Sequence, residues 1–586
     1  MEVHYSPEKA VLLLISLLKA HGIRRVVASP GSTNICLVAS LQSDPYFEMY
    51  SSVDERSAAY LACGIARESG EPVVISCTEA TASRNYLSGL TEAFYSKLPI
   101  LAITATNDRR CVGQNYPQMI DRSVTPRDVV KKSLILPYIA NDKDMHSYSN
   151  LVNDAILELF RDSGGPVHIE YETDYTRVFE VKELPSVKLV KRYTTDSELP
   201  QIPQGKLAII LGAHKPWSKE LTNIVEQFCE KYNCVVLSDH IGNYHGRYGV
   251  NPTIATSQTL YTPECCNIDT LIYLGDISSA YKKNYSIKNV WRVNPDGELR
   301  NVFGNLSCVF EMSELSFFER YLNDVGKSNQ QTTYYDEWQA EIEDLYANIG
   351  ELPFSNLWIA QQTGYLLPKE SRLFLGIENT LRTWNFFNIT EDINSFCNTG
   401  GFGIDGGVST LIGSSLVRPD KLYIGVIGDL AFFYDMNVLG NRHVGNNVRL
   451  MVINNGIGQQ FKNPGHPAAI AFSGVLDNFA DKYIAAAGHY GNKSPYLLKH
   501  YSEDLGFEYM SASNKEEFLK AVGKFVSPKN NGKSIIFEVF TSTQDETQAL
   551  RMMCNIKKDI KGAIKDTLKK GLGEKGIQLV KGILKY

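Results

Sequence analysis

An aspartate and an asparagine follow two consecutive apolar runs in the C-terminal third of the chain. Tyr423 to Ile427 leads into Gly428-Asp429, and Leu450 to Ile453 leads into Asn454-Asn455-Gly456. A helix-like stretch separates the runs, so the pattern predicts strand, helix, strand. Neighbouring strands of a parallel sheet open at their carboxyl ends into one crevice, where ligands bind. Carboxylate, amide and carbonyl oxygens suit Mg²⁺ or Ca²⁺, and Mg²⁺ prefers few protein ligands plus phosphates. The segment therefore predicts a metal-bridged diphosphate site.

Strand and helix patterns alternate along the rest of the chain as well. Apolar runs of strand length recur between helix-length runs in residues 1–182, 200–327 and 353–545, and polar linker-like segments separate these three parts. Apolar strands between helices are typical of parallel sheets that are covered on both faces. The sequence therefore predicts an α/β protein with three parallel-sheet domains, and the metal segment lies in the third.

The tail, residues 546–586, differs in composition. From Lys557 onward nine lysines stand against three acids, and isoleucines and leucines recur at helical spacing. This pattern predicts a basic amphipathic helix, which can lie on an anionic membrane surface or pack against protein. Five glycines weaken any helix here. We expect packing on the protein body or a partner subunit rather than peripheral membrane contact.

Composition limits the classes of function. The chain has 586 residues, of which 43% are apolar and 21% charged, as is typical of a soluble enzyme with several domains. A formal net charge of −6 gives no general attraction to nucleic acid. Eleven cysteines show no CxxC pair and no metal spacing, so we expect reduced thiols in a cytoplasmic protein. The apolar run Val11–Leu18 is too short to span a bilayer.

Four stretches resemble the motifs of one enzyme superfamily. In chain order they are SPGSTN with SSVDERSAAYLACGIA, then NTGGFGIDGGVST, GDLAFFYDMNVL and NNGIGQQF. Gly-Asp followed by Asn-Asn is similar to the metal and diphosphate motif of enzymes that use thiamine diphosphate (ThDP). Within that superfamily the chain resembles the synthases of 2-succinyl-5-enolpyruvyl-6-hydroxy-3-cyclohexene-1-carboxylate (SEPHCHC) in the menaquinone pathway. The resemblance implies pyrimidine-binding, middle and diphosphate-binding domains in that order.

The resemblance also implies which residues hold the cofactor. Asp429, Asn455 and the backbone carbonyl of Ile457 would bind Mg²⁺, although a shift by one residue would exchange Asn455 for Asn454. Ile404 matches a position whose bulk helps to hold ThDP in its bent shape. The residues expected to bind the cofactor are Gly403, Ile404, Asp405, Ser409, Gly428, Asn454 and Thr78.

One glutamate matches the catalytic acid of the superfamily. ThDP must lose a proton from its thiazolium ring, and a buried glutamate at the pyrimidine nitrogen promotes this step while the cofactor carries the chemistry. Glu55 in Asp54-Glu55-Arg56 is similar to that glutamate. Asp54 is better interpreted as the cap of the following helix. In the superfamily the glutamate and the diphosphate site come from different subunits, so the resemblance implies a homodimer or a dimer of dimers.

The expected substrate pocket departs from the synthase pattern. Two arginines that would bind carboxylates are replaced by Thr33 and Thr399, and threonine cannot supply that charge. Glu79 adds an acid where relatives have serine, which disfavours a multiply anionic substrate such as 2-oxoglutarate or isochorismate. The candidate substrate residues are Ser32, Thr33, Arg84, Arg382, Thr399 and Gln459.

These residues predict a ThDP- and Mg²⁺-dependent transferase or lyase. It would decarboxylate a 2-oxoacid and transfer the enamine-bound unit to an unknown acceptor, with a substrate different from that of SEPHCHC synthase. The alternatives are a simple 2-oxoacid decarboxylase, SEPHCHC synthase itself, or a non-catalytic homologue that keeps the fold.

Overall fold

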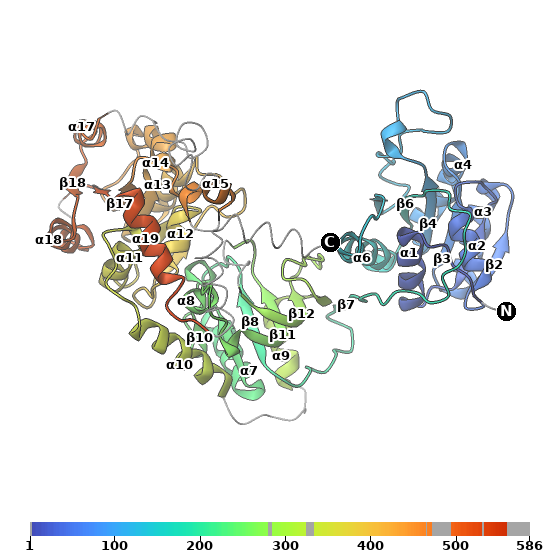
Figure 1. Ribbon diagram of the computed structural model, residues 1–586, viewed down its shortest axis with the longest axis horizontal. Coiled ribbons are helices and arrows are strands. Elements are labelled where there is room, and N and C mark those ends of the chain that lie inside the picture. The colour runs from blue at the N-terminus through green and yellow to red at the C-terminus, as the bar shows by residue number, and fades with distance from the viewer. Residues whose placement is uncertain are drawn as a thin grey trace. The chain divides into compact units, whose positions relative to one another are not determined.

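The computed structural model describes residues 3–278, 284–323, 333–463, 466–471, 494–529 and 532–559. The chain forms two compact units (Figure 1). Unit 1 comprises Met1–Ser197, Gly297–Asn301 and Asn305–Val309, and unit 2 comprises Glu198–Asp296, Val302–Gly304 and Phe310–Tyr586.

Unit 1 is built on a parallel sheet in the order β2-β1-β3-β4-β6-β5. Its strands are β1 (Arg25–Ala28), β2 (Glu48–Ser51), β3 (Val73–Cys77), β4 (Ile100–Thr106), β5 (Lys132–Leu136) and β6 (Val167–Glu172). Its helices are α1 (Lys9–Ala20), α2 (Ile35–Ser43), α3 (Glu55–Ser69), α4 (Thr81–Asn85), α5 (Leu87–Tyr95) and α6 (Asp142–Leu157). A short strand, β7 (Lys191–Thr194), ends this part of the chain.

Both faces of this sheet are buried by helices. Val26 packs into a core with α1, α2 and α6, whereas its neighbour Val27 packs into a second core with α3 and α5. Consecutive strand residues point to opposite faces, so a strand covered on both faces must be apolar at every position. This requirement explains why β3 and β4 are continuous apolar runs rather than alternating ones.

Unit 2 contains two more groups of parallel strands. The first has the order β10-β9-β8-β11-β12. Its strands are β8 (Leu207–Leu211), β9 (Cys234–Leu237), β10 (Gly249–Val250), β11 (Asn267–Leu274) and β12 (Ser286–Val293), and β13 (Leu306–Glu311) follows in the chain. The helices of this part are α7 (Lys219–Tyr232), α8 (Thr253–Thr256), α9 (Glu314–Asn323) and α10 (Thr333–Ala347).

The second group is a parallel sheet in the order β15-β14-β16-β17-β19-β18. Its strands are β14 (Arg372–Leu375), β15 (Asn394–Phe396), β16 (Tyr423–Gly428), β17 (Val448–Asn454), β18 (Glu508–Ala512) and β19 (Ile535–Phe540). Its helices are α11 (Asn356–Thr363), α12 (Asn379–Trp384), α13 (Gly407–Val417), α14 (Asp429–Asp435), α15 (Pro467–Ala471), α17 (Leu497–Asp504), α18 (Lys515–Phe525) and α19 (Thr543–Met553).

The first and last sheets share one strand order. In unit 1 the chain runs from β1 to β2 on one side and then returns to β3 on the other, and β14, β15 and β16 repeat this path in unit 2. Each sheet therefore has a topological switch point, between β1 and β3 and between β14 and β16. Ligands of open α/β sheets bind in the crevice at the carboxyl ends of such strands.

The expected α/β class with three parallel sheets is confirmed. The bounds predicted for the domains stay predictions. The predicted tail helix from residue 560 onward lies outside the described residues. Among the helices of the described residues, none is both long and apolar enough to cross a membrane.

The cysteines of the chain are unpaired and largely buried. All eleven are free, and eight of them are buried. In unit 1, burial raises the thiol pKa of Cys36 and Cys63 to about 11 and that of Cys77 to about 12. These thiols are therefore protonated at neutral pH.

The turn that follows β3 holds a strained residue. Ala80 has φ 58° and ψ −132°, a region that glycine adopts readily and other residues rarely. Ala80→Gly should raise the free energy of unfolding by about 1 kcal/mol, because relief of about 1–3 kcal/mol of strain outweighs the entropy of a more flexible unfolded chain. Urea denaturation measures the change.

A nearby alanine provides the control for this prediction. Ala82 lies inside α4, where glycine should destabilise by about 1 kcal/mol. If Ala80→Gly destabilised the protein as much as Ala82→Gly, the turn would not be strained.

Candidate functional site

A cavity in unit 2 lies at the carboxyl ends of β14, β16 and β17. Its volume is about 270 Å³, and its walls include Asp429, Asn455 and Ile457. Because β16 lies between β14 and β17 in the sheet, the three loops that follow these strands meet at one edge. The structure thus brings the three predicted metal ligands together at a switch point.

Asp429 connects two of these strand ends. It is the first residue of α14, it is 2% exposed, and its Oδ2 accepts a hydrogen bond of 2.9 Å from the backbone N–H of Gly456. Asn455 Oδ1 accepts from the backbone N–H of Ile457 at 3.3 Å. A carboxylate, an amide oxygen and a backbone carbonyl around one cavity form the hard oxygen donor set that Mg²⁺ requires. A side chain added at Gly428 would meet no atom within 4 Å. There is thus free space beside these oxygen donors that a phosphate could fill.

The two adjacent asparagines have different surroundings. Asn454 is the last residue of β17, and its Nδ2 donates to Glu538 Oε1 at 2.7 Å on the neighbouring strand β19. Burial raises the pKa of Glu538, and the hydrogen bond from Asn454 opposes this shift. Asn455 lines the cavity, whereas Asn454 does not. The geometry therefore favours Asn455 as the ligand and gives the side chain of Asn454 a structural contact with Glu538, and the expected cofactor contact of Asn454 stays a prediction.

The glycine-rich segment before α13 also contributes to this cavity. Ile404 and Phe402 line it, and a side chain at Gly403 would lie 2.6 Å from Asp405 Oδ1. The N–H and the hydroxyl of Ser409 both donate to the buried carboxylate of Asp435 at 2.6 Å, and its expected role in cofactor binding stays a prediction. Ser409 thus ties α13 to α14.

Glu55 lies in unit 1 as the first residue of α3. Its carboxylate is half-buried, and Oε2 accepts from Asn85 Nδ2 at 3.0 Å. The preceding residue, Asp54, caps the helix by accepting from the backbone N–H of Ser57 at 3.2 Å. Asp54 thus caps the helix, as the sequence indicated. Glu55 is less buried in the single chain than the sequence led us to expect.

A second cavity, of about 710 Å³, lies at the carboxyl ends of β1 and β2 in unit 1. Ser32 lines it. Thr33 is fully buried and its hydroxyl contacts that of Thr78 across the switch point. A side chain at Gly31 would lie 2.5 Å from Thr78 Cβ, so the loop after β1 passes too close to β3 for anything but glycine. Thr33 therefore holds two loops together, and its expected role at the substrate stays a prediction.

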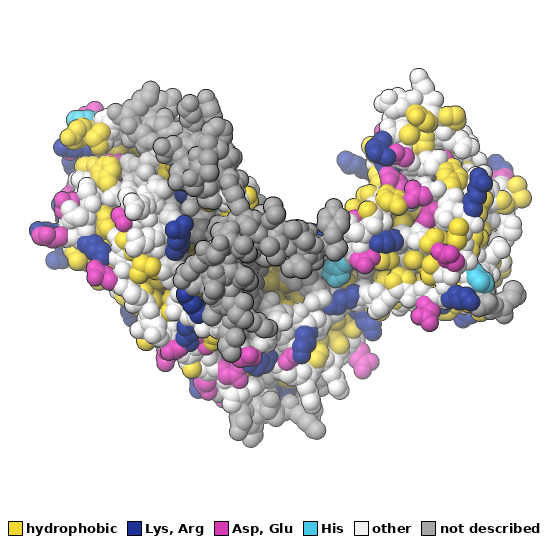
Figure 2. Space-filling model, viewed as in Figure 1, with side chains coloured by type: hydrophobic (Ala, Val, Ile, Leu, Met, Phe, Trp, Pro, Cys, Tyr) yellow, Lys and Arg dark blue, Asp and Glu magenta, His cyan; other side chains and the backbone are white. Residues whose placement is uncertain are grey.

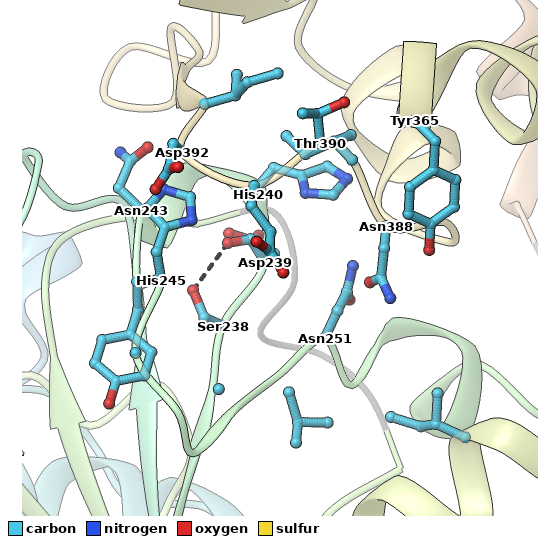
Figure 3. Close-up of a pocket in the computed structure, with 18 of the residues that line it drawn as sticks. Ser238, Asp239, His240, Asn243, His245, Asn251, Tyr365, Asn388, Thr390 and Asp392 are labelled. Carbon is cyan, nitrogen blue, oxygen red and sulfur yellow. Dashed lines mark hydrogen bonds between the residues drawn. The ribbon is translucent and has the colours of Figure 1, made fainter. Parts of the chain in front are cut away.

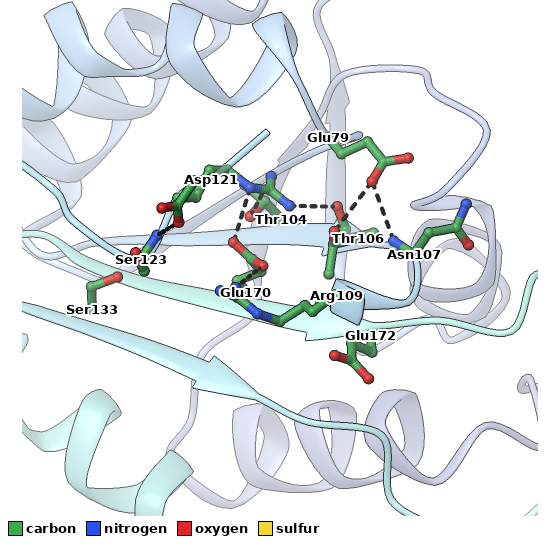
Figure 4. Close-up of polar contacts among 12 residues, drawn as sticks. Glu79, Thr104, Thr106, Asn107, Arg109, Asp121, Ser123, Ser133, Glu170 and Glu172 are labelled. Carbon is green, nitrogen blue, oxygen red and sulfur yellow. Dashed lines mark hydrogen bonds and ion pairs between the residues drawn. The ribbon is translucent and has the colours of Figure 1, made fainter. Parts of the chain in front are cut away.

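A buried polar network follows β3, β4 and β6 in unit 1 (Figure 4). Glu79, which is 2% exposed, accepts from the hydroxyl of Thr106 and the backbone N–H of Asn107, both at 3.2 Å. Arg122 and Glu170 are both buried and form an ion pair of 2.9 Å. Truncating one partner of such a pair is strongly destabilising because it leaves a buried charge unpaired. Glu79 is thus part of a network rather than an isolated acid.

Two of the remaining substrate candidates, the arginines, are paired with protein groups. Arg84 donates to the carbonyl of Asp121 at 2.8 Å. Arg382 forms an ion pair of 2.8 Å with Glu378, one helical turn earlier. Thr399 is buried, at 5% exposure. Gln459 lines the metal-side cavity, as expected of a substrate residue. The roles of all these residues stay predictions.

Sequence reasoning missed several residues that line the metal-side cavity, among them Glu378, Asn379 and Gln460. Glu378 and Asn379 follow β14, so the rule that found Asp429 at the end of β16 would also have indicated them. Gln460 is adjacent to Gln459 in the turn that was already identified.

A third cleft in unit 2 has a volume of about 400 Å³ and a polar lining that includes Asp239, His240 and Asp392 (Figure 3). His240 lies within hydrogen-bonding distance of the carbonyl of Trp384, at 3.0 Å. Asp239 accepts from Ser278 Oγ at 3.0 Å and from Asn385 Nδ2 at 3.3 Å. Both polar groups thus connect the segment after β9 with other parts of unit 2.

One buried and one partly buried histidine make the stability of the protein sensitive to acid. Burial lowers the pKa of His168 in unit 1 to about 3 and that of His240 in unit 2 to about 4, against about 6.5 in an unfolded chain. Because the folded pKa is the lower one, each neutral imidazole stabilises the fold above about pH 6.5, and this stability is lost as the pH falls toward 4. At about pH 5 we expect a loss of about 2 kcal/mol per histidine.

Urea unfolding at pH 8 and pH 5 measures this loss. His168→Gln should reduce the acid sensitivity of unit 1, whereas the exposed His146 can be changed to glutamine as a control without effect. An unchanged pH dependence in His168→Gln would contradict the assignment.

Comparisons with known proteins agree with the resemblance that the sequence motifs indicated. The family described as "Thiamine pyrophosphate enzyme, N-terminal TPP binding domain" matches residues 9–124. The chain is 31% identical over 574 residues to the 2-succinyl-5-enolpyruvyl-6-hydroxy-3-cyclohexene-1-carboxylate synthase of Bacteroides fragilis, with 93% of this chain and 98% of that protein covered. It is 26% identical over 562 residues to the synthase of the same name from Flavobacterium psychrophilum, with 91% and 96% covered.

A solved structure shows a weaker likeness. The thiamine diphosphate-dependent 4-hydroxybenzoylformate decarboxylase of Rhodococcus jostii RHA1 matches at a TM-score of 0.39 and 16% identity, with 91% of this chain and 99% of that chain covered. This overlap is too low to carry an argument. The synthase relatives, which match at up to 31% identity over nearly their whole length, establish that the chain belongs to the family of ThDP-dependent enzymes that includes the 2-succinyl-5-enolpyruvyl-6-hydroxy-3-cyclohexene-1-carboxylate synthases.

Proposed function

We propose that this protein is a ThDP- and Mg²⁺-dependent transferase that decarboxylates a 2-oxoacid and transfers the remaining unit to an acceptor, with a substrate different from that of SEPHCHC synthase. The observation that supports it best is the convergence of Asp429, Asn455 and Ile457 on one cavity at a switch point. ThDP, when bound, supplies a nucleophilic carbon that adds to the ketone of a 2-oxoacid and lets carbon dioxide leave.

The residues of the chain would bind and orient the reacting groups. Asp429, Asn455 and the carbonyl of Ile457 would hold the metal that bridges to the diphosphate. Glu55 would hold a proton at the pyrimidine nitrogen, and Asn85 orients its carboxylate through the 3.0 Å hydrogen bond. Ile404, which lines the same cavity as the metal ligands, would support the cofactor from one side.

The charges around the metal-side cavity support a change of substrate. Among the described residues that line it, none is lysine or arginine. Arg382 is paired with Glu378, and the threonines that replace the two family arginines are buried. These groups therefore include no unpaired arginine guanidinium that could bind a carboxylate of a multiply anionic substrate.

Exposed apolar residues support a homodimer in which Glu55 of one copy reaches the metal site of another. Val53, Tyr60 and Leu61 are 81%, 48% and 44% exposed at the start and along the outer side of α3. In unit 2, Leu416 and Val417 are 48% and 76% exposed at the end of α13. Exposed apolar clusters of this kind mark interaction surfaces, and two-fold symmetry would pair each with a second copy.

Surface charge and thiol chemistry give two further expectations. Basic and acidic side chains are interspersed on the face seen in Figure 2, which supports the absence of nucleic acid among its partners. The eleven free cysteines favour a cytoplasmic location, where thiols stay reduced.

Release of carbon dioxide tests the proposal. Purified protein with ThDP and Mg²⁺ should release carbon dioxide from at least one 2-oxoacid of a panel, and an added acceptor should change the product from an aldehyde to a longer carbon chain. Aldehyde alone would indicate a simple decarboxylase. Failure to bind ThDP with Mg²⁺ in a calorimeter would overturn the proposal in favour of a non-catalytic homologue.

A further inference from the structure

A groove in unit 1 lies between helix α2 and strand β2, which is the edge strand of its sheet. It is the cavity of about 710 Å³ that Ser32 lines, and we call it the α2 cavity. Residues three, four and seven positions apart share one face of a helix, and the lining repeats this spacing on α2, so one face of the helix is open beside the sheet edge. The side chains from the two elements are Ile35, Val38, Ala39 and Gln42 of α2 and Met49, Tyr50 and Ser51 of β2.

The α2 cavity is uncharged and mainly apolar. Among the described residues that line it, none carries a charge. Its apolar side chains are accessible, since Ile35 is 51% exposed and Tyr50 is 40% exposed. Cavities of about 300–1,000 Å³ with a mostly apolar lining and a few polar groups are typical of small-molecule sites. The cavity therefore fits a ligand with an apolar body and no charge at the end that enters it.

The cavity lies beside the segment that leads to Glu55. Ala28 and Ser51, which are paired across β1 and β2, both line it. Helix α3 begins at Glu55, four residues after Ser51, and four residues span at most about 14 Å. Glu55 itself does not line the cavity. A ligand bound here would thus lie close to the proposed catalytic acid without taking its place.

The loop after β1 separates the cavity from a residue that is expected to bind the cofactor. A side chain added at Gly31, which lines the cavity, would lie 2.5 Å from Cβ of Thr78. Thr78 does not line the cavity, so it lies on the other side of this loop. The α2 cavity is therefore a neighbour of the expected cofactor site and not part of it.

We propose that the α2 cavity binds the side chain of the 2-oxoacid donor, and that this side chain is uncharged and mainly apolar. This inference rests on the proposed function. Ser32, an exposed residue of the lining, offers a hydroxyl donor to the single carboxylate of such an acid. A second carboxylate at the end of the side chain would lose its hydration among uncharged groups, which costs free energy unless a cation compensates for it.

Two donors of equal length test the charge preference. They are 2-oxopentanoate and 2-oxoglutarate, which differ only in a terminal methyl group in place of a carboxylate. With ThDP and Mg²⁺ bound, 2-oxopentanoate should release carbon dioxide with a kcat/KM at least about tenfold above that of 2-oxoglutarate. The value should also rise by about fourfold for each methylene group from 2-oxobutanoate to 2-oxohexanoate, because each buried methylene adds hydrophobic stabilisation.

A cation placed in the cavity should change this preference. Ile35→Arg adds a guanidinium that can pair with the second carboxylate of 2-oxoglutarate, so the ratio of the two kcat/KM values should shift by about tenfold or more toward 2-oxoglutarate. Gln42→Arg should act in the same direction if Ile35→Arg fails to fold. Leu151→Arg, at a 42% exposed position of α6 outside the cavity, is the matched control and should keep the wild-type ratio.

Binding provides a readout apart from turnover. Pentanoate and glutarate match the two donors but lack the ketone and cannot react. In ligand-observed nuclear magnetic resonance with the protein loaded with ThDP and Mg²⁺, pentanoate should bind at least about tenfold more tightly than glutarate. Ile35→Arg should reduce this difference by about tenfold or more.

The outcomes separate the two proposals. If no 2-oxoacid releases carbon dioxide, the proposed function fails and the donor inference fails with it. If carbon dioxide is released but 2-oxoglutarate reacts as well as 2-oxopentanoate, only the inference about the α2 cavity is overturned. Equal affinities for pentanoate and glutarate would overturn it as well. So would a changed oligomeric state in both Ile35→Arg and Gln42→Arg, measured by sedimentation, because it would show that a second copy fills the cavity.

Discussion

Glu55→Gln should lower the turnover of the 2-oxoacid by about 100-fold or more while the protein keeps its fold and still binds ThDP. Glutamine keeps the shape of the side chain and its contact with Asn85, but it cannot hold an acidic proton at the pyrimidine nitrogen. Proton transfer by a positioned side chain contributes about 10²–10⁴-fold to a rate. Carbon dioxide release measures turnover, and calorimetry measures cofactor binding.

The residue before Glu55 provides the matched control. Asp54→Asn makes the same change from acid to amide, and asparagine caps a helix about as well as aspartate. This variant should retain both wild-type stability and wild-type turnover. Near wild-type turnover in Glu55→Gln, or an equal loss in both variants, would remove Glu55 from the catalytic role.

Asp429→Ala should have the second large effect, on cofactor binding. We expect the affinity for ThDP at limiting Mg²⁺ to fall by about 100-fold or more, because even residues that only orient metal ligands are worth about 10–100-fold in metal affinity. The variant also loses the hydrogen bond between Asp429 and Gly456 that joins two strand ends. Titration calorimetry at several Mg²⁺ concentrations measures the change.

The neighbouring asparagines sharpen this prediction. Asn455→Ala should weaken the Mg²⁺ dependence of ThDP binding, whereas Asn454→Ala should mainly destabilise β17, since it leaves Glu538 without the donor at 2.7 Å. Asp420→Ala, on the exposed surface, should change neither property. Unchanged ThDP affinity in Asp429→Ala would place the metal elsewhere.

The sequence predicted a metal site at two strand ends and named Asn455 as a ligand, but it left Asn454 open as the alternative. Apolar runs end at Asp429 and at the two asparagines because a strand covered on both faces turns polar where it leaves the core. Which asparagine faces the cavity depends on the strand period of two. Asn454 still belongs to β17 and shares a face with Val452, whose neighbour on β19 is Glu538. Where a strand ends to within one residue is decided by tertiary packing, which a single sequence does not contain.

Two further features were hidden for a related reason. The first and last sheets share one strand order, but their sequences show no close repeat, because many apolar residues fill the same kind of core. The metal-side cavity combines Glu378 with Gln459, which are far apart in the chain and line one cavity because β14 and β17 both flank β16. Cavity residues of this kind require the topology before they can be recognised.

The buried thiols make local opening of the protein measurable by their chemical reactivity. A protonated thiol hidden in a core reacts with an alkylating reagent only when the surrounding structure opens. Cys63 and Cys77 lie in the core of unit 1, and Cys229 and Cys265 are buried in unit 2. Pulsed alkylation followed by peptide mass spectrometry would therefore time the opening of each unit separately, with no engineered label.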